Sequence, residues 1–189
     1  DGSAVNAEGA VEMCIGCHSQ EGNLDFTLLG YDAFTIMEPE PMMGEATSMP
    51  DVPADGAALL AYITETSHYT GWAYVTDADG MDFLPSVSPH GPVVRVFLNH
   101  LALEGLGGDL TMGADDMMMD ALPYGSIIVK EAYQTEGATP DNPGDLTALT
   151  VMYKVEGFDP DNGDWFWLAA APDGSAVNAE GAVEMCIGC

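Results

Sequence analysis

The sequence LTVMYKV at residues 149–155 decides the predicted fold, because it is a short run of β-branched, aromatic and other apolar residues. Three more runs of this kind are VVRVFL at 93–98, SIIVK at 126–130 and DWFWL at 164–168. Glycine, proline, asparagine or aspartate bounds these runs. Such runs between turn-forming residues are typical of β-strands. The sequence therefore predicts a mainly antiparallel β-sheet.

Two stretches predict short helices beside this sheet. Asp55-Gly56 precedes the apolar residues 57–62, AALLAY, which is the pattern of a capped helix. Residues 179–185, AEGAVEM, have few β-branched side chains and predict a second helix. The predicted fold class is therefore α+β, mainly antiparallel β-sheet with short helices.

Charge is the extreme feature of the composition. The chain has 189 residues, 47% of them hydrophobic, which is enough for one ordinary domain with a buried core. It carries 31 acidic side chains against 3 lysines and arginines, a formal net charge of −28. Nucleic acid and anionic membranes are excluded as partners, because their phosphates would meet a negative field. No apolar run approaches the roughly 18 residues of a membrane-spanning helix, so we expect no membrane span.

The residues Cys14-Ile15-Gly16-Cys17-His18 form a C-x-x-C-H segment, the attachment pattern of c-type haem. Cysteines three residues apart lie on neighbouring positions of a helical turn, where both meet the vinyl groups of one haem. His18 is then the proximal iron ligand. A zinc site or a thiol redox pair is the alternative, but zinc needs four ligands. The motif predicts covalent haem c, and hence an extracellular or periplasmic protein.

Residues 1–17, DGSAVNAEGAVEMCIGC, recur without change at residues 173–189. The second copy makes Cys186 and Cys189 further candidates for haem attachment. A repeat of seventeen identical residues predicts a chain of similar units that are joined head to tail. We expect residues 1–37 to be a haem-attachment segment and tail, equivalent to the C-terminal end of a preceding unit. Residues 38–54 are then an acidic, proline-rich linker, or alternatively a surface loop, and residues 55–189 form the main domain.

The sixth iron ligand and a calcium site are left open by the sequence. Candidate iron ligands are Met42, Met43, Met117, Met118, Met119, His68, His90 and His100. Core or loop roles are the alternative for the methionines, and a turn role for His90. The acidic residues 77–82 and 159–164 resemble calcium loops but lack a terminal bidentate glutamate. We expect plain acidic turns there, with calcium binding as the alternative.

Several segments together resemble the cytochrome P-460 family. They are residues 90–99, 122–131, 149–154, 157–160, 163–167 and 186–189, in that order. The resemblance implies that residues 55–189 form a P-460-like domain whose antiparallel sheet packs on haem c. Residues 19–26 resemble the short tail that follows the haem motif in that family. The resemblance thus runs to Cys189 and resumes at the beginning of the chain, which also indicates tandem units.

Members of this family oxidise hydroxylamine or bind nitric oxide, and the oxidising members carry a lysine cross-linked to the haem. Lys130 and Lys154 are the two lysines here, and with His90 they are candidates for binding the cofactor. We expect ordinary haem c without the cross-link. The leading hypothesis is an exported c-type cytochrome unit, a haem-bearing repeat of an extracellular filament or tandem array, in electron transfer. Alternatives are a hydroxylamine-oxidising or nitric-oxide-binding protein, and a structural filament stabilised by haem.

Overall fold

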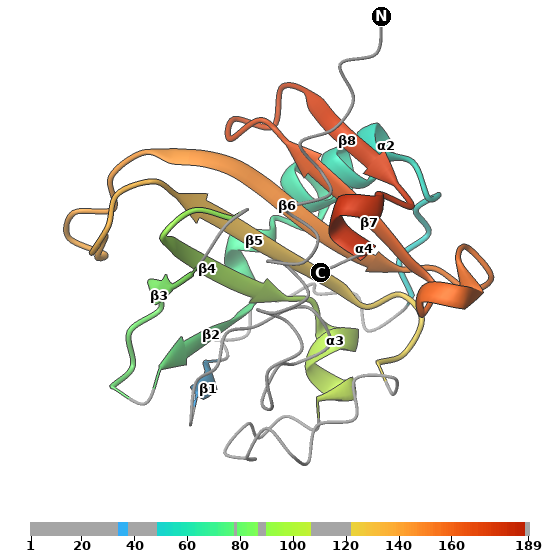
Figure 1. Ribbon diagram of the computed structural model, residues 1–189. Coiled ribbons are helices and arrows are strands. Elements are labelled where there is room, and N and C mark those ends of the chain that lie inside the picture. The colour runs from blue at the N-terminus through green and yellow to red at the C-terminus, as the bar shows by residue number, and fades with distance from the viewer. Residues whose placement is uncertain (1–33, 38–48, 78, 87–89, 107–121, 188–189) are drawn as a thin grey trace, which may run out of the picture.

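The computed structural model of the chain describes residues 34–37, 49–77, 79–86, 90–106 and 122–187. Within these residues, eight strands form one antiparallel sheet (Figure 1). The strands are β1 (Phe34–Met37), β2 (Ala73–Asp77), β3 (Leu84–Pro85), β4 (Val93–Leu98), β5 (Ile127–Tyr133), β6 (Leu146–Lys154), β7 (Trp165–Ala170) and β8 (Val177–Gly181). Their order is β1-β2-β4-β5-β6-β7-β8, and β3 also pairs with β4. The strands from β4 onward therefore form a meander in which each strand pairs with the next.

Short helices and single turns complete the described fold. They are α2 (Gly56–Ala61), η1 (Tyr62–Thr66, π-helical), η2 (Tyr69–Gly71, 3₁₀), α3 (His100–Gly105), η5 (Pro160–Asn162, 3₁₀) and α4 (Glu184–Ile187). Asp55 caps α2, because its Oδ1 accepts a hydrogen bond from the backbone N–H of Ala58 at 2.9 Å. Asn99 caps α3 in the same way, through the N–H of Ala102 at 3.0 Å. In both helices, the capping side chain thus accepts a hydrogen bond from a backbone N–H group of the first turn.

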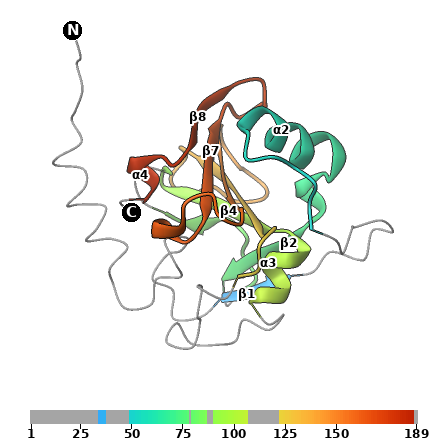
Figure 2. The same cartoon turned by 90° about the vertical axis from the view of Figure 1, so that its right-hand side faces the viewer.

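The register gives the sheet two chemically different faces. Directly paired residues share a face, so the row Val96, Lys130, Thr150, Ala169 and Ala179 crosses one side from β4 to β8. We call this side the lysine face, since Lys154 also belongs to it. The opposite side is called the helix face, because α2 and η1 pack on it. Figure 2 shows α2 and α4 on opposite sides of β7.

Each face carries its own apolar core. On the helix face, Leu59, Leu60 and Ile63 pack against side chains of β4 to β7. On the lysine face, α3 and the segment before β5 pack near the ends of β4 and β5. The buried residues of this second cluster are Ala73, Val75, Leu84, Val94, Val96, Leu98, Ala102, Leu103, Leu122, Ile128, Met152 and Trp165. The sheet is therefore covered on both sides at its centre, where every residue of β5 is buried.

The predicted α+β class, with a mainly antiparallel sheet and few short helices, is confirmed. The four predicted strands correspond to β4, β5, β6 and β7, and the predicted capped helix is α2. The helix predicted over residues 179–185 is wrong in its first part. Residues up to Gly181 form β8, and a helix begins only at Glu184. Pairing with the edge of β7 outweighs local helix propensity, which is a weak preference.

Segments outside the predicted main domain also join the sheet. The strand β1 pairs with β2 in antiparallel register from Phe34 to Met37. Val52 and Ala54 pack against the helix-face core, and the backbone oxygen of Val52 accepts a hydrogen bond from the hydroxyl of Tyr153 at 3.0 Å. Within the described residues, no helix has the length and apolar character needed to cross a membrane.

Candidate functional site

Small side chains surround Lys130 on the lysine face. Ala132 lies beside Ala148, and Thr150 lies beside Ala169, which in turn pairs with Ala179. Ala148, Thr150, Ala169 and Ala179 are half-buried, whereas residues of the same strands on the helix face, such as Val151 and Leu168, are almost fully buried. We call Lys130, Ala148, Thr150, Trp167, Ala169 and Ala179 the small-residue patch. Four of these six side chains are small, and Lys130 and Trp167 are the two large ones.

Lys130 places its ammonium-bearing side chain at this patch. The residue is 6% exposed and pairs directly with Thr150 of β6. Burial of a lysine is unusual, because removing the charge from water is costly unless polar groups or counter-charges surround it. Lys130 is one of only three lysine and arginine residues in a chain with a formal net charge of −28. A basic side chain at the patch is compatible with a ligand that carries negative charge at one edge.

Lys154 lies on the same face but outside the patch. It is four residues further along β6 than Thr150, and its Nζ lies 5.3 Å from the ring centroid of Trp165. This cation–π contact places Lys154 against the apolar core of the lysine face. The two candidate lysines therefore have different surroundings, and only Lys130 belongs to the small-residue patch.

His90 approaches the patch from the loop before β4. Its Nδ1 lies 3.4 Å from the hydroxyl oxygen of Thr150. Gly91 fixes this approach, since it has a φ of +86° and a Cβ there would lie 2.8 Å from the backbone oxygen of Tyr133. The sequence predicted His90 as a cofactor-binding candidate, and the structure places it beside Lys130 through their common neighbour Thr150.

Cys186 lies in α4, immediately after β8, and is half-buried. The backbone N–H of Cys186 donates to the oxygen of Val183 at 2.8 Å, which orients the turn. Burial raises the pKa of the Cys186 thiol, and the positive charge of Lys130 partly opposes this by lowering it. Cys186 follows β8 by five residues, and the last residue of β8, Gly181, pairs with Trp167 of the patch. The structure thus places Thr150 next to both Lys130 and His90, and the strand that precedes Cys186 borders the same patch.

Trp167 supplies an unsatisfied polar atom at the same patch. It pairs with Met152 on one side and Gly181 on the other, one row from Lys130. Its indole Nε1 is buried and has no hydrogen-bond partner within the described part of the chain. Leaving such a donor unpaired costs about 1–3 kcal/mol. An acceptor supplied by a ligand would remove this cost.

The sequence predicts a c-type haem, whose porphyrin is flat and largely apolar and whose two propionates are negatively charged acceptors. The small side chains of the patch, the side chain of Lys130 and the indole N–H of Trp167 are compatible with such a group. Cys186 belongs to the second C-x-x-C pair, which the sequence predicts as a candidate for thioether attachment. Sequence analysis missed Trp167 and Thr150, although the period-two alternation of the strands puts them on the same face as the lysines.

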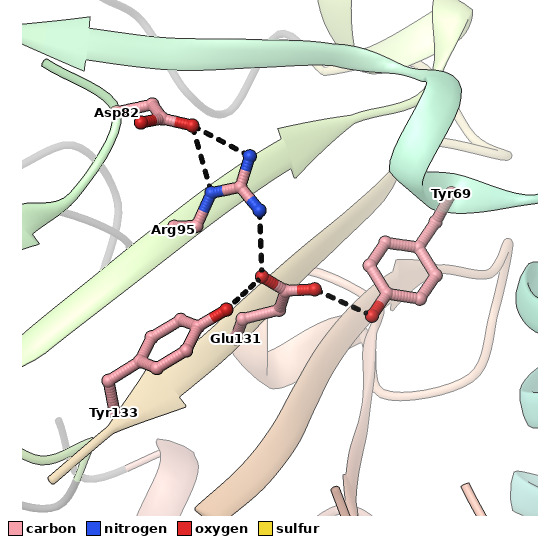
Figure 3. Close-up of polar contacts among 5 residues, drawn as sticks. All are labelled: Tyr69, Asp82, Arg95, Glu131 and Tyr133. Carbon is pink, nitrogen blue, oxygen red and sulfur yellow. Dashed lines mark hydrogen bonds and ion pairs between the residues drawn. The ribbon is translucent and has the colours of Figure 1, made fainter. Parts of the chain in front are cut away.

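A second polar cluster lies on the helix face, centred on the carboxylate of Glu131 (Figure 3). Its Oε2 accepts from Arg95 Nη1 at 3.3 Å and from the Tyr133 hydroxyl at 2.8 Å, and its Oε1 accepts from the Tyr69 hydroxyl at 2.9 Å. Arg95 also donates to Asp82 Oδ2 from Nε at 2.9 Å and from Nη2 at 2.6 Å. The members of the cluster satisfy one another, and the cluster therefore serves as a structural tie between β4, β5, η2 and the segment that precedes β3.

Burial and the neighbouring carboxylate raise the pKa of both tyrosines in this cluster. For Tyr133, burial and the hydrogen bond to Glu131 raise the pKa to about 12. For Tyr69, burial and the charge of Glu131 also raise the pKa. Both hydroxyls therefore stay protonated at neutral pH and act as donors.

The other two candidate histidines, His68 and His100, form contacts with residues outside the small-residue patch. His68 has its Nδ1 2.9 Å from the backbone oxygen of Thr64, and His100 has its Nε2 3.5 Å from Oε1 of Glu104. Several predicted residues lie outside the described part of the chain. They are Cys14, Cys17, His18, Cys189, Met42, Met43, Met117, Met118 and Met119.

The two acidic segments form turns with internal hydrogen bonds. Asp77 Oδ1 accepts from the backbone N–H groups of Asp79 and Met81 at 2.9 and 2.8 Å. Asp164 Oδ1 accepts from the N–H of Asp159 at 3.1 Å, and Asp164 Oδ2 accepts from the Tyr124 hydroxyl at 3.0 Å. Among the described residues, no three histidine, cysteine or acidic side chains are grouped so as to hold a metal ion.

No protein-family model matches the chain, and no curated protein matches its sequence.

Proposed function

We propose that this chain is an exported c-type cytochrome unit, similar to the cytochrome P-460 family, that carries a covalent haem on the small-residue patch and takes part in electron transfer. The observation that carries the proposal is the position of Cys186. The sequence predicts this cysteine as a candidate for haem attachment, and it follows β8, whose Ala179 and Gly181 pair with Ala169 and Trp167 of the patch. The strand that borders the patch therefore leads to a candidate haem-attachment cysteine.

Each residue of the proposed site has a distinct role. Cysteines of the C-x-x-C pairs tether the haem, and His18 ligates the iron. Lys130 balances negative charge on the cofactor, and Trp167 donates its free indole N–H to an acceptor at the patch. When bound, the haem supplies a one-electron iron couple whose potential depends on axial ligands, charge and burial.

The −28 charge supports an extracellular or periplasmic setting, where salt and divalent cations screen self-repulsion. The repeated seventeen residues support association of identical units head to tail. A filament or tandem array of haem-bearing units combines these features. We expect Lys130 and Lys154 to remain free of covalent cross-links to the haem, and peptide mass mapping tests this expectation.

A second function, binding of nitric oxide or oxidation of hydroxylamine, is favoured by the His90–Thr150 pair. These side chains place a hydrogen-bonding group beside the patch, where a small polar ligand of the iron could interact. The absorption spectrum separates the two functions. A low-spin, six-coordinate iron supports electron transfer, and a high-spin iron that takes up nitric oxide supports the second function.

The test of haem attachment is retention of haem by the denatured chain. The chain is produced with a c-type haem maturation system and then run on a denaturing gel stained for haem peroxidase activity. We expect the full chain to retain haem, because thioether bonds survive unfolding. Cys14→Ser combined with Cys17→Ser should reduce the stain, and His68→Ala is the control that should leave it unchanged. Complete extraction of haem by acidic acetone would refute the proposal.

A further inference from the structure

The edge of β7 and the start of α2 form a seat for strand β8. The strand pairs with β7 through Trp167–Gly181, Leu168–Glu180, Ala169–Ala179 and Ala170–Val177. A carboxylate oxygen of Glu180, Oε2, accepts a hydrogen bond from the backbone N–H of Gly56 at 2.7 Å. This bond satisfies a donor at the N-terminus of α2 and joins segments 124 residues apart. The seat therefore recognises both the backbone and specific side chains of β8.

Gly56 is required for this close approach. A Cβ at Gly56 would collide with Oε2 of Glu180, and it would lie 3.1 Å from Leu168 Cδ1 and from Val177 Cγ1. Val177 also packs against the helix-face core. The seat thus has three specific features: the edge of β7, a small apolar site for Val177 and an N–H donor for Glu180.

The seat has two candidate occupants of identical sequence. Residues 1–17 repeat residues 173–189, so Val5 corresponds to Val177, Glu8 to Glu180 and Cys14 to Cys186. Every β8 residue that contacts the seat is present in the first copy. One chain therefore contains one described seat and two segments that match it.

We propose that residues 1–17 of a second copy of this chain take the place of β8 on β7, so that chains associate by strand exchange. This proposal rests on the head-to-tail association in the proposed function and names the surface that performs it. We commit to a second chain as the donor because the repeated segments at residues 1–17 and 173–189 predict head-to-tail association. The chain's own residues 1–17 are the alternative donor, since the 16 residues between Cys17 and Phe34 could span up to about 55 Å, more than the six strand spacings of about 4.8 Å between β1 and β8. A monomeric Val177→Asp variant is the result expected of that internal donor.

The exchange has a consequence for the small-residue patch. The strand β8 contributes Ala179 to the patch and ends at Gly181, and Cys186 lies in α4 five residues further along the chain. An identical strand in the same register would lead Cys14 to the same place, followed by Cys17 and His18. Strand exchange would thus bring a complete C-x-x-C-H segment from one chain to the patch of its neighbour.

The repeated sequence allows matched variants of the full chain. Val177→Asp places a charge in the apolar site and disfavours the C-terminal copy, whereas Val5→Asp makes the same change in the N-terminal copy. We expect Val177→Asp to form dimers or longer oligomers by light scattering in 0.5 M salt, because the N-terminal copy of another chain fills the seat. Val5→Asp should not form such oligomers. The double variant Val5→Asp, Val177→Asp should be monomeric, and its urea midpoint should be lower.

A second pair of variants with milder substitutions keeps the test valid if the aspartate variants unfold. Glu180→Ala should make the urea midpoint rise with protein concentration, and Glu8→Ala should leave it independent of concentration. The proposal is overturned if Val177→Asp is monomeric, whether folded or unfolded, and the midpoint of Glu180→Ala does not change with concentration. These readouts do not depend on haem retention, so their failure is distinguishable from failure of the proposed haem attachment.

Discussion

Arg95 and Glu131 lie directly opposite one another on β4 and β5, and their Nη1 and Oε2 atoms are 3.3 Å apart. The same carboxylate accepts hydrogen bonds from the hydroxyls of Tyr69 and Tyr133. In a chain with 31 acidic residues, a buried carboxylate needs such donors to offset its loss of hydration. The cluster ties η2 to the centre of the sheet and so helps to fix the strands that carry Lys130 on the other face.

Replacing Glu131 by glutamine should destabilise the fold. The amide removes the negative charge opposite Arg95 and turns one acceptor into a donor that faces existing donors. We expect a loss of about 1.5–3 kcal/mol in the free energy of unfolding, measured by urea denaturation. Glu136→Gln, at an exposed position, is the control and should change stability by less than about 0.5 kcal/mol. Equal stability of the two variants would contradict the assigned role of the cluster.

Stability should fall at alkaline pH because of the buried tyrosines. The pKa of Tyr133 is about 12 in the folded chain, against about 10 for an unperturbed tyrosine. The unfolded chain therefore loses this proton first, so the contribution is fully present below pH 10 and is lost as the pH rises towards 12. Tyr133→Phe should lower stability at pH 7 and also flatten the decline between pH 10 and 12. Urea midpoints across this range test both effects, and an unchanged slope in the variant would contradict the assignment.

The sequence predicted the sheet well because its strands are locally encoded. Residues 93–98 form β4 as predicted, and their apolar, β-branched pattern needs no knowledge of distant partners. Strand β8 was missed because its conformation depends on pairing with β7 and on the bond from Gly56 to Glu180. Cys186 and Lys130 were separately predicted as candidates, but the strand register that sets β8, and hence the segment that precedes Cys186, beside the patch depends on long-range pairing.

Asn99 shows why long-range polar contacts escaped prediction. Its Oδ1 accepts from the N–H groups of Ala102 and Ile127, and its Nδ2 donates to the oxygen of Gly125 at 2.8 Å. The cap of α3 is local, but the contacts with the start of β5 span at least 26 residues. One side chain thus joins β4, α3 and β5, and no short sequence pattern encodes this.

Asn99→Ala should therefore cost more than an ordinary helix cap. A lost cap costs about 1 kcal/mol, and orphaned buried backbone groups at Ile127 and Gly125 add to this. We expect a total loss of about 2–4 kcal/mol in urea denaturation. Asp55→Ala, which removes the exposed cap of α2, is the comparison and should cost about 1 kcal/mol. A similar cost for both variants would show that the contacts to β5 contribute little.

The proximity of Lys130 and Cys186 predicts a change in thiol reactivity. In the haem-free chain, the ammonium of Lys130 favours the Cys186 thiolate, although burial raises the pKa of the thiol overall. Lys130→Met removes the positive charge and keeps the side chain's length, so the pKa of Cys186 should rise further. Alkylation of Cys186 by iodoacetamide at pH 8.5 should then slow, as measured by mass spectrometry of the peptide that contains it. Lys154→Met is the matched control, because Lys154 packs over Trp165 outside the patch.

If both lysine variants slow alkylation equally, the effect reflects net charge alone, and Cys186 is not specifically coupled to Lys130. A slower reaction in Lys130→Met alone would support the placement of a haem-attachment cysteine at the small-residue patch.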